Sequence, residues 1–296
     1  MPVDIQSDRV VLHHPAGAST TILLYGATVI SWISPSISGT SAVPVTAEGP
    51  ALVERFFVSS LASLDGSKPV RGGIPICWPI FGQPSREENK ALKQHGFARS
   101  SVWKYEETVL DAREGVSGRF ILENSDQTDK LFPHPFKLVY TVTLAEHQLT
   151  TSLRVHNTGS APLAFQALLH NYFKGESSIA QVQPLKGVTY RDKVRNMVED
   201  VETREIVDVR EYTDRVYEAA GGNYTLSFPR SVHISIKTHN LPDVTVWNPQ
   251  ETGSSMADME PNGWAHYVCV EPGYVKQFVE LKQGEEWWGQ QVLTVL

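Results

Sequence analysis

Arg71 and Arg99 stand near the two ends of a segment rich in glycine and proline that runs from Lys68 to Arg99. Arg71 is followed directly by two glycines, and Gln94, His95 and Arg99 lie within six residues of one another. Glycine admits backbone conformations closed to other residues, and proline fixes φ. The segment therefore predicts a system of rigid loops that holds side chains for a ligand.

The side chains of this segment suit an anionic ligand. The guanidinium groups of Arg71 and Arg99 can each fork onto a cluster of anionic oxygens, and Gln94 and His95 add neutral donors for hydroxyl or phosphoryl oxygens. Arginine is also common in surface ion pairs, and from residue types alone that alternative carries equal weight.

Candidates for proton transfer lie further along the chain. Glu271 follows an apolar run and precedes Pro272-Gly273, which predicts a carboxylate at a strand end, beside hydrophobic surface. Partial desolvation there would raise the pKa of Glu271 toward that of a useful base. An exposed glutamate at a strand end is the commoner case when the residue is considered alone.

A histidine and a second acidic residue complete the set of candidates. His170 also ends an apolar run, and Tyr172 and Phe173 follow it, so taken alone it fits a core histidine somewhat better. A histidine that faces a carboxylate across a dry cleft would instead supply a general acid and a general base without a cofactor. Asp214 lies between two tyrosines in a further strand-like segment.

Motifs for other chemistries are missing from the sequence. It contains no G-x-G-x-x-G, Walker A, H-E-x-x-H, C-x-x-C or G-x-S-x-G pattern, so nucleotide, zinc-protease and hydrolase-elbow chemistry lose support. His13-His14 has no acidic or cysteine partner nearby and predicts a solvated pair. We expect neither a metal site nor a cofactor, and we expect Cys77 and Cys269 to be buried free thiols.

The charge balance bears on partners and location. The 26 basic and 33 acidic residues give 26 − 33 = −7, which argues against nucleic acid or an anionic membrane as the main partner. No run of 18 apolar residues predicts a membrane span, and no apolar leader is evident. A cytoplasmic protein that binds a small molecule is the expectation.

Short apolar segments that often alternate with polar residues predict an all-β protein. The clearest pair is 137–144 and 149–156, joined as a hairpin, in which Leu149, Leu153 and Val155 share one face. The other strand candidates are 10–12, 20–24, 29–33, 56–61, 119–122, 164–170, 232–237, 244–247, 266–271, 277–281 and 291–295.

Few helices are expected beside these strands. One spans 86–93 and begins with a Ser85/Glu88 capping box, and a helical turn lies within 192–200. The glycine pair before Asn223 predicts a hairpin tip. The whole pattern favours a single domain over residues 1–296, built of antiparallel sheets packed face to face.

Several of these segments together resemble a known enzyme family. They are Arg71-Gly-Gly-Ile-Pro, Gln94-His-Gly-Phe-Ala-Arg99, Leu169-His-Asn-Tyr-Phe173, Thr213-Asp-Arg-Val-Tyr217, Val246-Trp-Asn-Pro249 and Glu271-Pro-Gly273. In this order they resemble the glucose-6-phosphate 1-epimerases, or hexose-6-phosphate mutarotases, of the galactose-mutarotase-like group. The resemblance runs from about residue 68 to residue 273.

The resemblance implies a fold, an activity and roles for residues. The fold would be a large antiparallel β-sandwich, or supersandwich, with a few short helices and no metal or nucleotide. The activity would be anomer interconversion of hexose 6-phosphates, chiefly glucose 6-phosphate. The implied catalytic residues are His170 and Glu271, and the implied substrate-binding residues are Arg71, Gln94, Arg99 and Asp214, with the arginines serving the phosphate. Beside these we expect His95 and Trp247 to bind substrate, and we expect a monomer.

Two details of the resemblance stay open. Asn171 stands where the family pattern has threonine, which puts the local hydrogen bonding of His170 in question. Trp247 could stack on an apolar sugar face or be a plain core residue.

Three other functions remain as alternatives. The first is an aldose 1-epimerase for unphosphorylated sugars, with the same chemistry and no anion site. The second is a glycoside hydrolase that uses Asp214 and Glu271 as its carboxylate pair. The third is a non-catalytic regulator that binds sugar phosphates.

Overall fold

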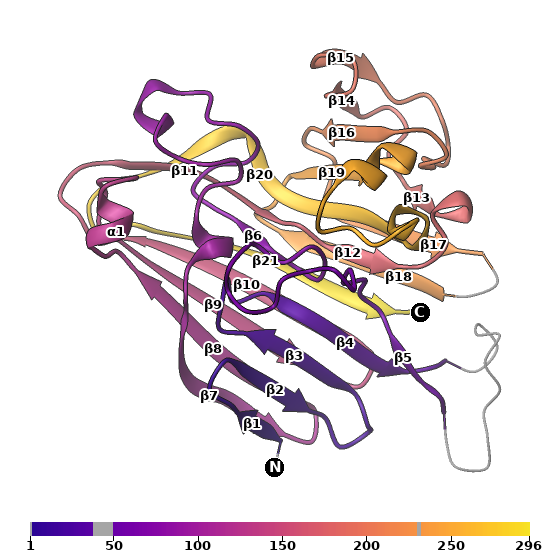
Figure 1. The fold of residues 1–296 in the computed structure, drawn as a ribbon, viewed down its shortest axis with the longest axis horizontal. Helices are drawn as coiled ribbons and strands as arrows, with labels where there is room; N and C mark the ends of the chain where they lie inside the picture. The colour runs from indigo at the N-terminus through magenta and orange to yellow at the C-terminus, as the bar shows by residue number, and fades with distance from the viewer. Residues whose placement is uncertain (1, 38–49, 230–231) are drawn as a thin grey trace.

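The described part of the chain forms three antiparallel sheets (Figure 1). The structure is a computed structural model that describes residues 2–37, 50–229 and 232–296. The predicted all-β class with antiparallel sheets is confirmed, and helices are few and short. Among the described residues, no helix is long and apolar enough to cross a bilayer.

Each strand belongs to one of these sheets. The five-stranded sheet has the order β1 (Val3–Ile5), β2 (Arg9–His13), β3 (Ser19–Leu23), β4 (Val29–Pro35) and β5 (Leu52–Glu54). The first eight-stranded sheet has the order β13 (Gln181–Gln183), β17 (Asn223–Phe228), β18 (Val232–His239), β21 (Glu286–Val295), β10 (Gln148–Asn157), β9 (Phe136–Leu144), β8 (Gly115–Glu123) and β7 (Lys104–Ala112).

The second eight-stranded sheet carries most of the polar candidates. Its members are β15 (Val198–Val201), β14 (Thr189–Asp192), β16 (Thr213–Tyr217), β19 (Asp243–Asn248), β20 (Tyr267–Leu281), β11 (Leu163–Leu169), β6 (Ile76–Cys77) and β12 (Tyr172–Lys174), the last of which pairs with β20 off the main path. The helical elements are α1 (Asp126–Asp129) and the 3₁₀ turns Glu87–Asn89, Ala98–Ser100, Ser177–Ile179, Gln250–Ser255 and Gly263–His266.

Buried apolar side chains that alternate with more exposed ones along the strands form the core. In β10 the side chains of Leu149, Leu153 and Val155 are buried, whereas those between them are at least partly exposed except for Thr151. The predicted β9–β10 hairpin is confirmed, with Leu144 opposite Leu149. The five-stranded sheet lies over β7–β10 in Figure 1, and its apolar residues join theirs in one core cluster.

The glycine- and proline-rich segment from Lys68 to Arg99 has little regular structure, as predicted. Gly73 has a φ of +65°, and a Cβ there would lie 2.1 Å from the carbonyl oxygen of Val29. Only glycine permits so close an approach of two backbone segments. The loops thereby pack directly on β4.

Both predicted helical segments are wrong. Within 86–93 there is one 3₁₀ turn, Glu87–Asn89, capped by Arg86 without a side-chain hydrogen bond, so the Ser85 capping box does not form. So short a segment, with only Asn89 and Leu92 buried, does not stabilise an isolated helix. Residues 192–200 instead form the turn between β14 and β15 and the start of β15.

Three strand assignments also need correction. β20 runs unbroken through Pro272-Gly273, because at this point it changes neighbours: residues 269–273 pair with β19 and 273–281 with β11. The segment 56–61 has only isolated bridges, at Phe56 and Val58. The glycine pair before Asn223 is not a hairpin tip, since it joins β16 and β17, which belong to different sheets. The assignment of one domain stays a prediction.

Candidate active site

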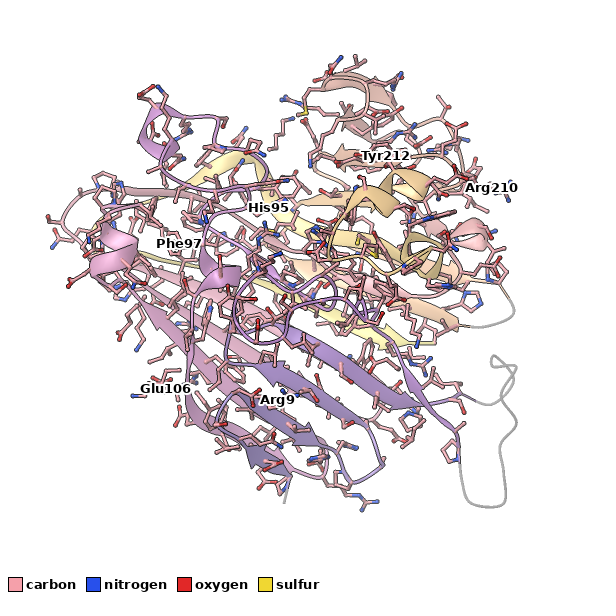
Figure 2. All side chains as sticks on the ribbon, viewed as in Figure 1. Arg9, His95, Phe97, Glu106, Arg210 and Tyr212 are labelled. Carbon is pink, nitrogen blue, oxygen red and sulfur yellow. The ribbon has the colours of Figure 1, made fainter. Side chains whose placement is uncertain are left out.

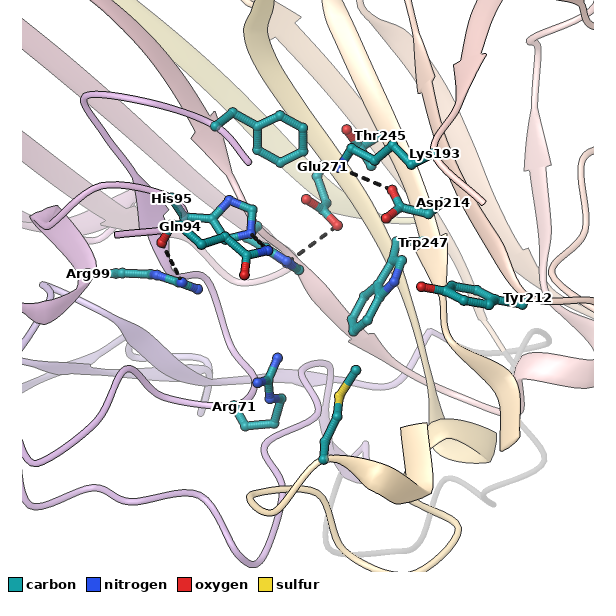
Figure 3. A pocket seen from close by; sticks show the side chains of 13 residues that line it. Arg71, Gln94, His95, Arg99, Lys193, Tyr212, Asp214, Thr245, Trp247 and Glu271 are labelled. Carbon is teal, nitrogen blue, oxygen red and sulfur yellow. Dashed lines mark hydrogen bonds and ion pairs between the residues drawn. The ribbon is translucent and has the colours of Figure 1, made fainter. Parts of the chain in front are cut away.

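A cavity of about 240 Å³ opens beside the middle of the second eight-stranded sheet (Figure 3). All eight residues proposed from the sequence line it: Arg71, Gln94, His95, Arg99, His170, Asp214, Trp247 and Glu271. The sequence analysis missed five further lining residues, which are Phe81, Lys193, Tyr212, Thr245 and Met256. Figure 2 labels two of the contributors, His95 in the 94–99 loop and Tyr212 in the segment before β16.

Three adjacent strands supply one wall of the cavity. In their register Asp214 of β16 lies opposite Trp247 of β19, and Thr245 of β19 lies opposite Glu271 of β20. Directly opposed residues in antiparallel strands point to the same face, as do residues two apart along one strand. These four side chains therefore share a face, although Asp214 and Glu271 are distant in sequence.

His170 reaches the same place from the link between β11 and β12. Its backbone N–H donates to the carbonyl of Pro75 at 3.0 Å, which ties the link to the 68–99 loops. Its ring stacks on Tyr172 at a centroid distance of 4.8 Å and meets the edge of Trp247 at 5.7 Å. The imidazole is thus held on two sides by aromatic rings.

His170 and Glu271 form a buried pair. Nδ1 of His170 lies 3.4 Å from Oε1 of Glu271, and the two residues are 7% and 1% exposed. Neither Nδ1 of His170 nor Oε2 of Glu271 has a hydrogen-bond partner among the described protein atoms. A buried polar atom without a partner needs an explanation, and a catalytic role is one. Glu271 is therefore not the exposed strand-end residue that its sequence context favoured.

Burial moves the two pKa values in opposite directions. It raises the pKa of Glu271 well above its ordinary value, with Lys193 and Arg99 opposing this and Asp214 adding to it. It lowers the pKa of His170 well below its ordinary value, and Arg99, Arg71 and Lys193 lower it further. The protein alone thus favours a protonated carboxyl beside a neutral imidazole. The rise predicted for Glu271 is confirmed in direction.

Arg99 is the cation that is most open to an anionic ligand. Its Nη2 donates to the carbonyl of Gln94 at 3.0 Å, its Nε is buried without a partner, and it forms no ion pair within the described ranges. Arg71, by contrast, is held by Asp258 at 3.1 Å and by the Tyr172 hydroxyl at 3.3 Å. The two arginines line the same cavity, but the guanidinium group of Arg71 already has an acidic partner in the protein, whereas that of Arg99 has none within the described ranges.

His95 and Gln94 contribute neutral polar groups. The N–H of Gly82 donates to Nδ1 of His95 at 3.2 Å, and Nε2 of His95 lies 3.2 Å from the Gln94 amide nitrogen. Burial lowers the pKa of His95, and nearby Arg99 lowers it further. Both effects favour the neutral form of His95, and its role in binding a substrate stays a prediction.

Lys193, which the sequence analysis missed, supplies a third cation. It lies in the turn after β14, where its N–H donates to the carbonyl of Asp214 at 2.9 Å. Its Nζ is 3.2 Å from Oδ1 of Asp214 and 4.1 Å from the centre of the Phe81 ring. Burial raises the pKa of Asp214, and Lys193 opposes that rise.

The Lys193–Asp214 pair also borders a second, larger cavity of about 520 Å³. There Glu218, which is buried, pairs with Arg191 at 2.7 Å and with Lys276 at 2.5 Å. Each of the three cations that line this outer cavity, as we call it, therefore has a carboxylate partner within the protein.

Asn171 has a structural role beside His170. It is fully buried, donates to the carbonyl of Val270 at 2.9 Å, and exchanges two hydrogen bonds of 2.8 Å with Gln291. These bonds connect the β11–β12 link to β20 and β21. The asparagine thus anchors the backbone next to the histidine.

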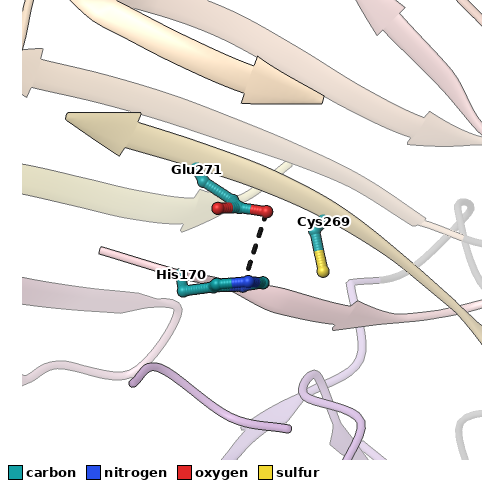
Figure 4. A group of neighbouring side chains, drawn as sticks. All are labelled: His170, Cys269 and Glu271. Carbon is teal, nitrogen blue, oxygen red and sulfur yellow. Dashed lines mark ion pairs between the residues drawn. The ribbon is translucent and has the colours of Figure 1, made fainter. Parts of the chain in front are cut away.

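One group in the described part of the chain combines three residue types that ligate metals. The ligand atoms of His170, Cys269 and Glu271 all lie within 4.8 Å of one another (Figure 4). Spacing along the chain could not indicate this, because His170 is far from the other two. Cys269 and Cys77 are both buried free thiols, as predicted.

Comparisons with known proteins agree on one family. The sequence pattern of the family described as aldose 1-epimerase matches residues 8–294. A protein of Salmonella typhimurium provisionally named glucose-6-phosphate 1-epimerase is 32% identical over 272 residues, which cover 90% of this chain and 83% of that protein. One of the same provisional name from Cenchrus ciliaris is 28% identical over 299 residues, or 98% of this chain and 85% of the relative.

Solved structures are similar over nearly the whole chain. A protein of Salmonella typhimurium provisionally described as a mutarotase superposes with a TM-score of 0.83 at 27% identity, covering 99% of this chain and 92% of that one. Galactose 1-epimerase from Lactobacillus acidophilus has a TM-score of 0.68 at 14% identity, covering 100% and 97%. The latter similarity concerns the fold alone.

Proposed function

This chain belongs to the aldose 1-epimerase family, and we propose that it interconverts the α and β anomers of hexose 6-phosphates, chiefly glucose 6-phosphate. One observation carries the proposal: a buried histidine–glutamate pair faces a small cavity that arginines also line. The pair provides proton transfer, and the arginines provide a place for the phosphate.

In the proposed mechanism, ring opening needs one proton removed and one proton supplied. The Glu271 carboxylate takes the proton of the O1 hydroxyl, and the protonated His170 donates one to the ring oxygen. The C1–O5 bond breaks as the C1–O1 carbonyl forms, which gives the free aldehyde. Rotation about C1–C2 presents the other carbonyl face, and ring closure reverses both transfers.

The charged form of the pair is disfavoured in the protein alone, so the substrate has to promote it. Arg99 and Arg71 are the charges that add most to the low pKa of His170. A phosphate dianion that binds these arginines compensates their charge and thereby raises the pKa of His170. A proton can then pass from Glu271 to His170 across their 3.4 Å contact, which produces the base and the acid together.

The other lining residues would orient the sugar. Asp214, fixed by Lys193, accepts hydrogen bonds from hydroxyls, and Gln94 and His95 offer further polar contacts. Trp247 lines the cavity and also packs on Tyr172 and Tyr267, so it would contact the sugar while serving the core. The substrate is the only partner that we propose, and a monomer in the cytoplasm remains our prediction.

An unphosphorylated aldose would undergo the same chemistry, but the unpaired Arg99 favours a phosphorylated one. Membership of the epimerase family favours anomerisation over glycoside hydrolysis by Asp214 and Glu271. The buried proton-transfer pair favours an enzyme over a regulator that only binds sugar phosphates.

An anomerisation assay tests the proposal. Freshly dissolved α-glucose 6-phosphate is followed by polarimetry, with α-glucose as the control sugar and heated protein as the blank. We expect the protein to accelerate the approach to equilibrium far more for the phosphorylated sugar. Equal acceleration of both would favour the unphosphorylated-aldose alternative, and acceleration of neither would contradict an epimerase.

A further inference from the structure

We propose that His170, Cys269 and Glu271 form a binding site for a thiophilic divalent cation such as Zn²⁺ or Cd²⁺, and that such a cation inhibits the enzyme by occupying its proton-transfer pair. The binding is independent of the proposed function, whereas the inhibition rests on it. The cation is an inhibitor, so this site is compatible with catalysis that needs no metal.

The backbone brings the three ligands together. Cys269 and Glu271 are two residues apart on β20, so their side chains leave the same face of the strand. Tyr172 lies opposite Cys269 in the β12–β20 pairing, which places His170, two residues earlier, beside the same strand. The ligand atoms all lie within 4.8 Å of one another, and all three residues are buried.

Two of these residues present atoms that lack a partner. Nδ1 of His170 and Oε2 of Glu271 are buried and accept or donate no hydrogen bond among the described protein atoms. Cys269 is a free thiol. One ion bound to the imidazole, the carboxylate and the sulfur would provide the missing interaction.

The ligand chemistry selects the cation. Zinc binds thiolate at about 2.3 Å and imidazole or carboxylate at about 2.0–2.2 Å, which places ligand atoms somewhat closer together than here. Modest side-chain rotations would close that difference. Sulfur and nitrogen ligands favour Zn²⁺ and Cd²⁺ over Mg²⁺ and Ca²⁺. Binding releases the thiol proton and the carboxyl proton to solvent, so it strengthens as pH rises.

The cavity explains access and inhibition. His170 and Glu271 line the cavity, whereas Cys269 does not, so the ion would enter from the substrate side and keep an open coordination position toward it. The ion and the sugar would then exclude one another. Neither imidazole nor carboxylate could transfer protons while coordinated.

Cadmium absorption tests the binding, and zinc inhibition tests its consequence. Cys269→Ser is compared with Cys77→Ser, because Cys77 is an equally buried free thiol that packs in an apolar cluster, does not line the cavity and is not one of the three proposed ligands. Circular dichroism confirms that each variant is folded, and Cys269→Ala replaces the serine variant if that one is not.

We expect Cd²⁺ to produce thiolate-to-metal ultraviolet absorption in the wild type and in Cys77→Ser but not in Cys269→Ser. We expect Zn²⁺ to inhibit the first two in competition with glucose 6-phosphate, and Cys269→Ser to need at least about tenfold more Zn²⁺. Mg²⁺ is the control ion.

Cadmium absorption that is unchanged in Cys269→Ser would overturn the site, whether or not the protein is an epimerase. Cadmium binding without any epimerase activity would leave the site intact and contradict only the proposed function. Inhibition that substrate does not relieve, or that Cys269→Ser shares in full, would overturn the inhibitory role.

Discussion

Burial of one carboxyl group and one imidazole determines what the site can do. In water Glu271 would be a weak base and His170 a partly protonated acid, but here burial raises the pKa of the first and lowers that of the second. Both shifts favour the neutral pair, with the proton on Glu271, over the charged pair. Such a pair suits a reaction that runs in both directions.

Removal of either member should lower the turnover of anomer interconversion by about 10²–10⁴-fold, the usual contribution of one general acid or base. The variants are His170→Ala and Glu271→Gln, measured by polarimetry on α-glucose 6-phosphate. Both should stay folded, because Nδ1 of His170 and Oε2 of Glu271 have no hydrogen-bond partner to lose in the described structure. Near-normal turnover in a folded variant would refute its role as acid or base.

Lys193 should set the pH at which the base becomes available. It lowers the pKa of Glu271, so Lys193→Met raises that pKa. Because the base is active only when deprotonated, the acidic limb of the kcat/KM profile should move to higher pH. The pH profile is measured at constant ionic strength, since salt screens charge effects.

Lys276→Met is the matched control for this variant. Lys276 pairs with Glu218 in the outer cavity, and its charge has no part in the pKa shift of Glu271. Its acidic limb should coincide with that of the wild type. If both variants shift the acidic limb equally, the shift reflects a general charge effect and not a specific effect of Lys193 on Glu271.

Most residues of the site could be predicted, but their geometry could not. The resemblance identified eight lining residues through motifs, whereas Lys193 follows an ordinary strand and was assigned to a helical turn. Its position depends on the β14–β15 hairpin and on its backbone bond to Asp214. Residues that are brought together by strand pairing leave no local pattern in a single sequence.

At the scale of elements, local turn signals were the weakest guide. Pro272-Gly273 has the composition of a turn, yet β20 continues through it because strands on both sides pair with it. The alternating β9 and β10 segments were predicted correctly, since their pattern directly reports one buried face. Pairing between strands overrides the turn propensity of a short segment, whereas a long alternating pattern still predicts a strand correctly.

The loop that carries His95 depends on a glycine. Gly96 has a φ of +69°, and a Cβ there would lie 2.1 Å from the carbonyl oxygen of Trp78. Gly96→Ala should therefore lower the free energy of unfolding by more than about 2 kcal/mol, from backbone strain together with the clash. The measurement is urea denaturation at equilibrium.

Gly187→Ala isolates the contribution of the backbone angle. Gly187 has a φ of +83°, but its added Cβ would meet nothing within 4 Å. The loss there should be about 1 kcal/mol. Losses of the same size in both variants would mean that the close approach of Gly96 to Trp78 is not a constraint.

At the scale of the whole molecule, the net charge limits how a sugar phosphate can bind. A protein with a net charge of −7 repels a sugar phosphate dianion at long range, so affinity has to come from a few close cations. Arg71 is already paired with Asp258, and Lys193 with Asp214. Arg99 has no acidic partner within the described residues, which makes it the main cation for the phosphate.

The most direct test is the selectivity of Arg99→Ala for phosphorylated over plain sugar. A charge-assisted contact contributes about 1.5–3 kcal/mol, so kcat/KM for glucose 6-phosphate should fall by at least about tenfold. The slow reaction on glucose should change much less, with both sugars assayed at the same ionic strength. Equal losses on the two sugars would contradict a phosphate site at Arg99 and point to an epimerase of unphosphorylated aldoses.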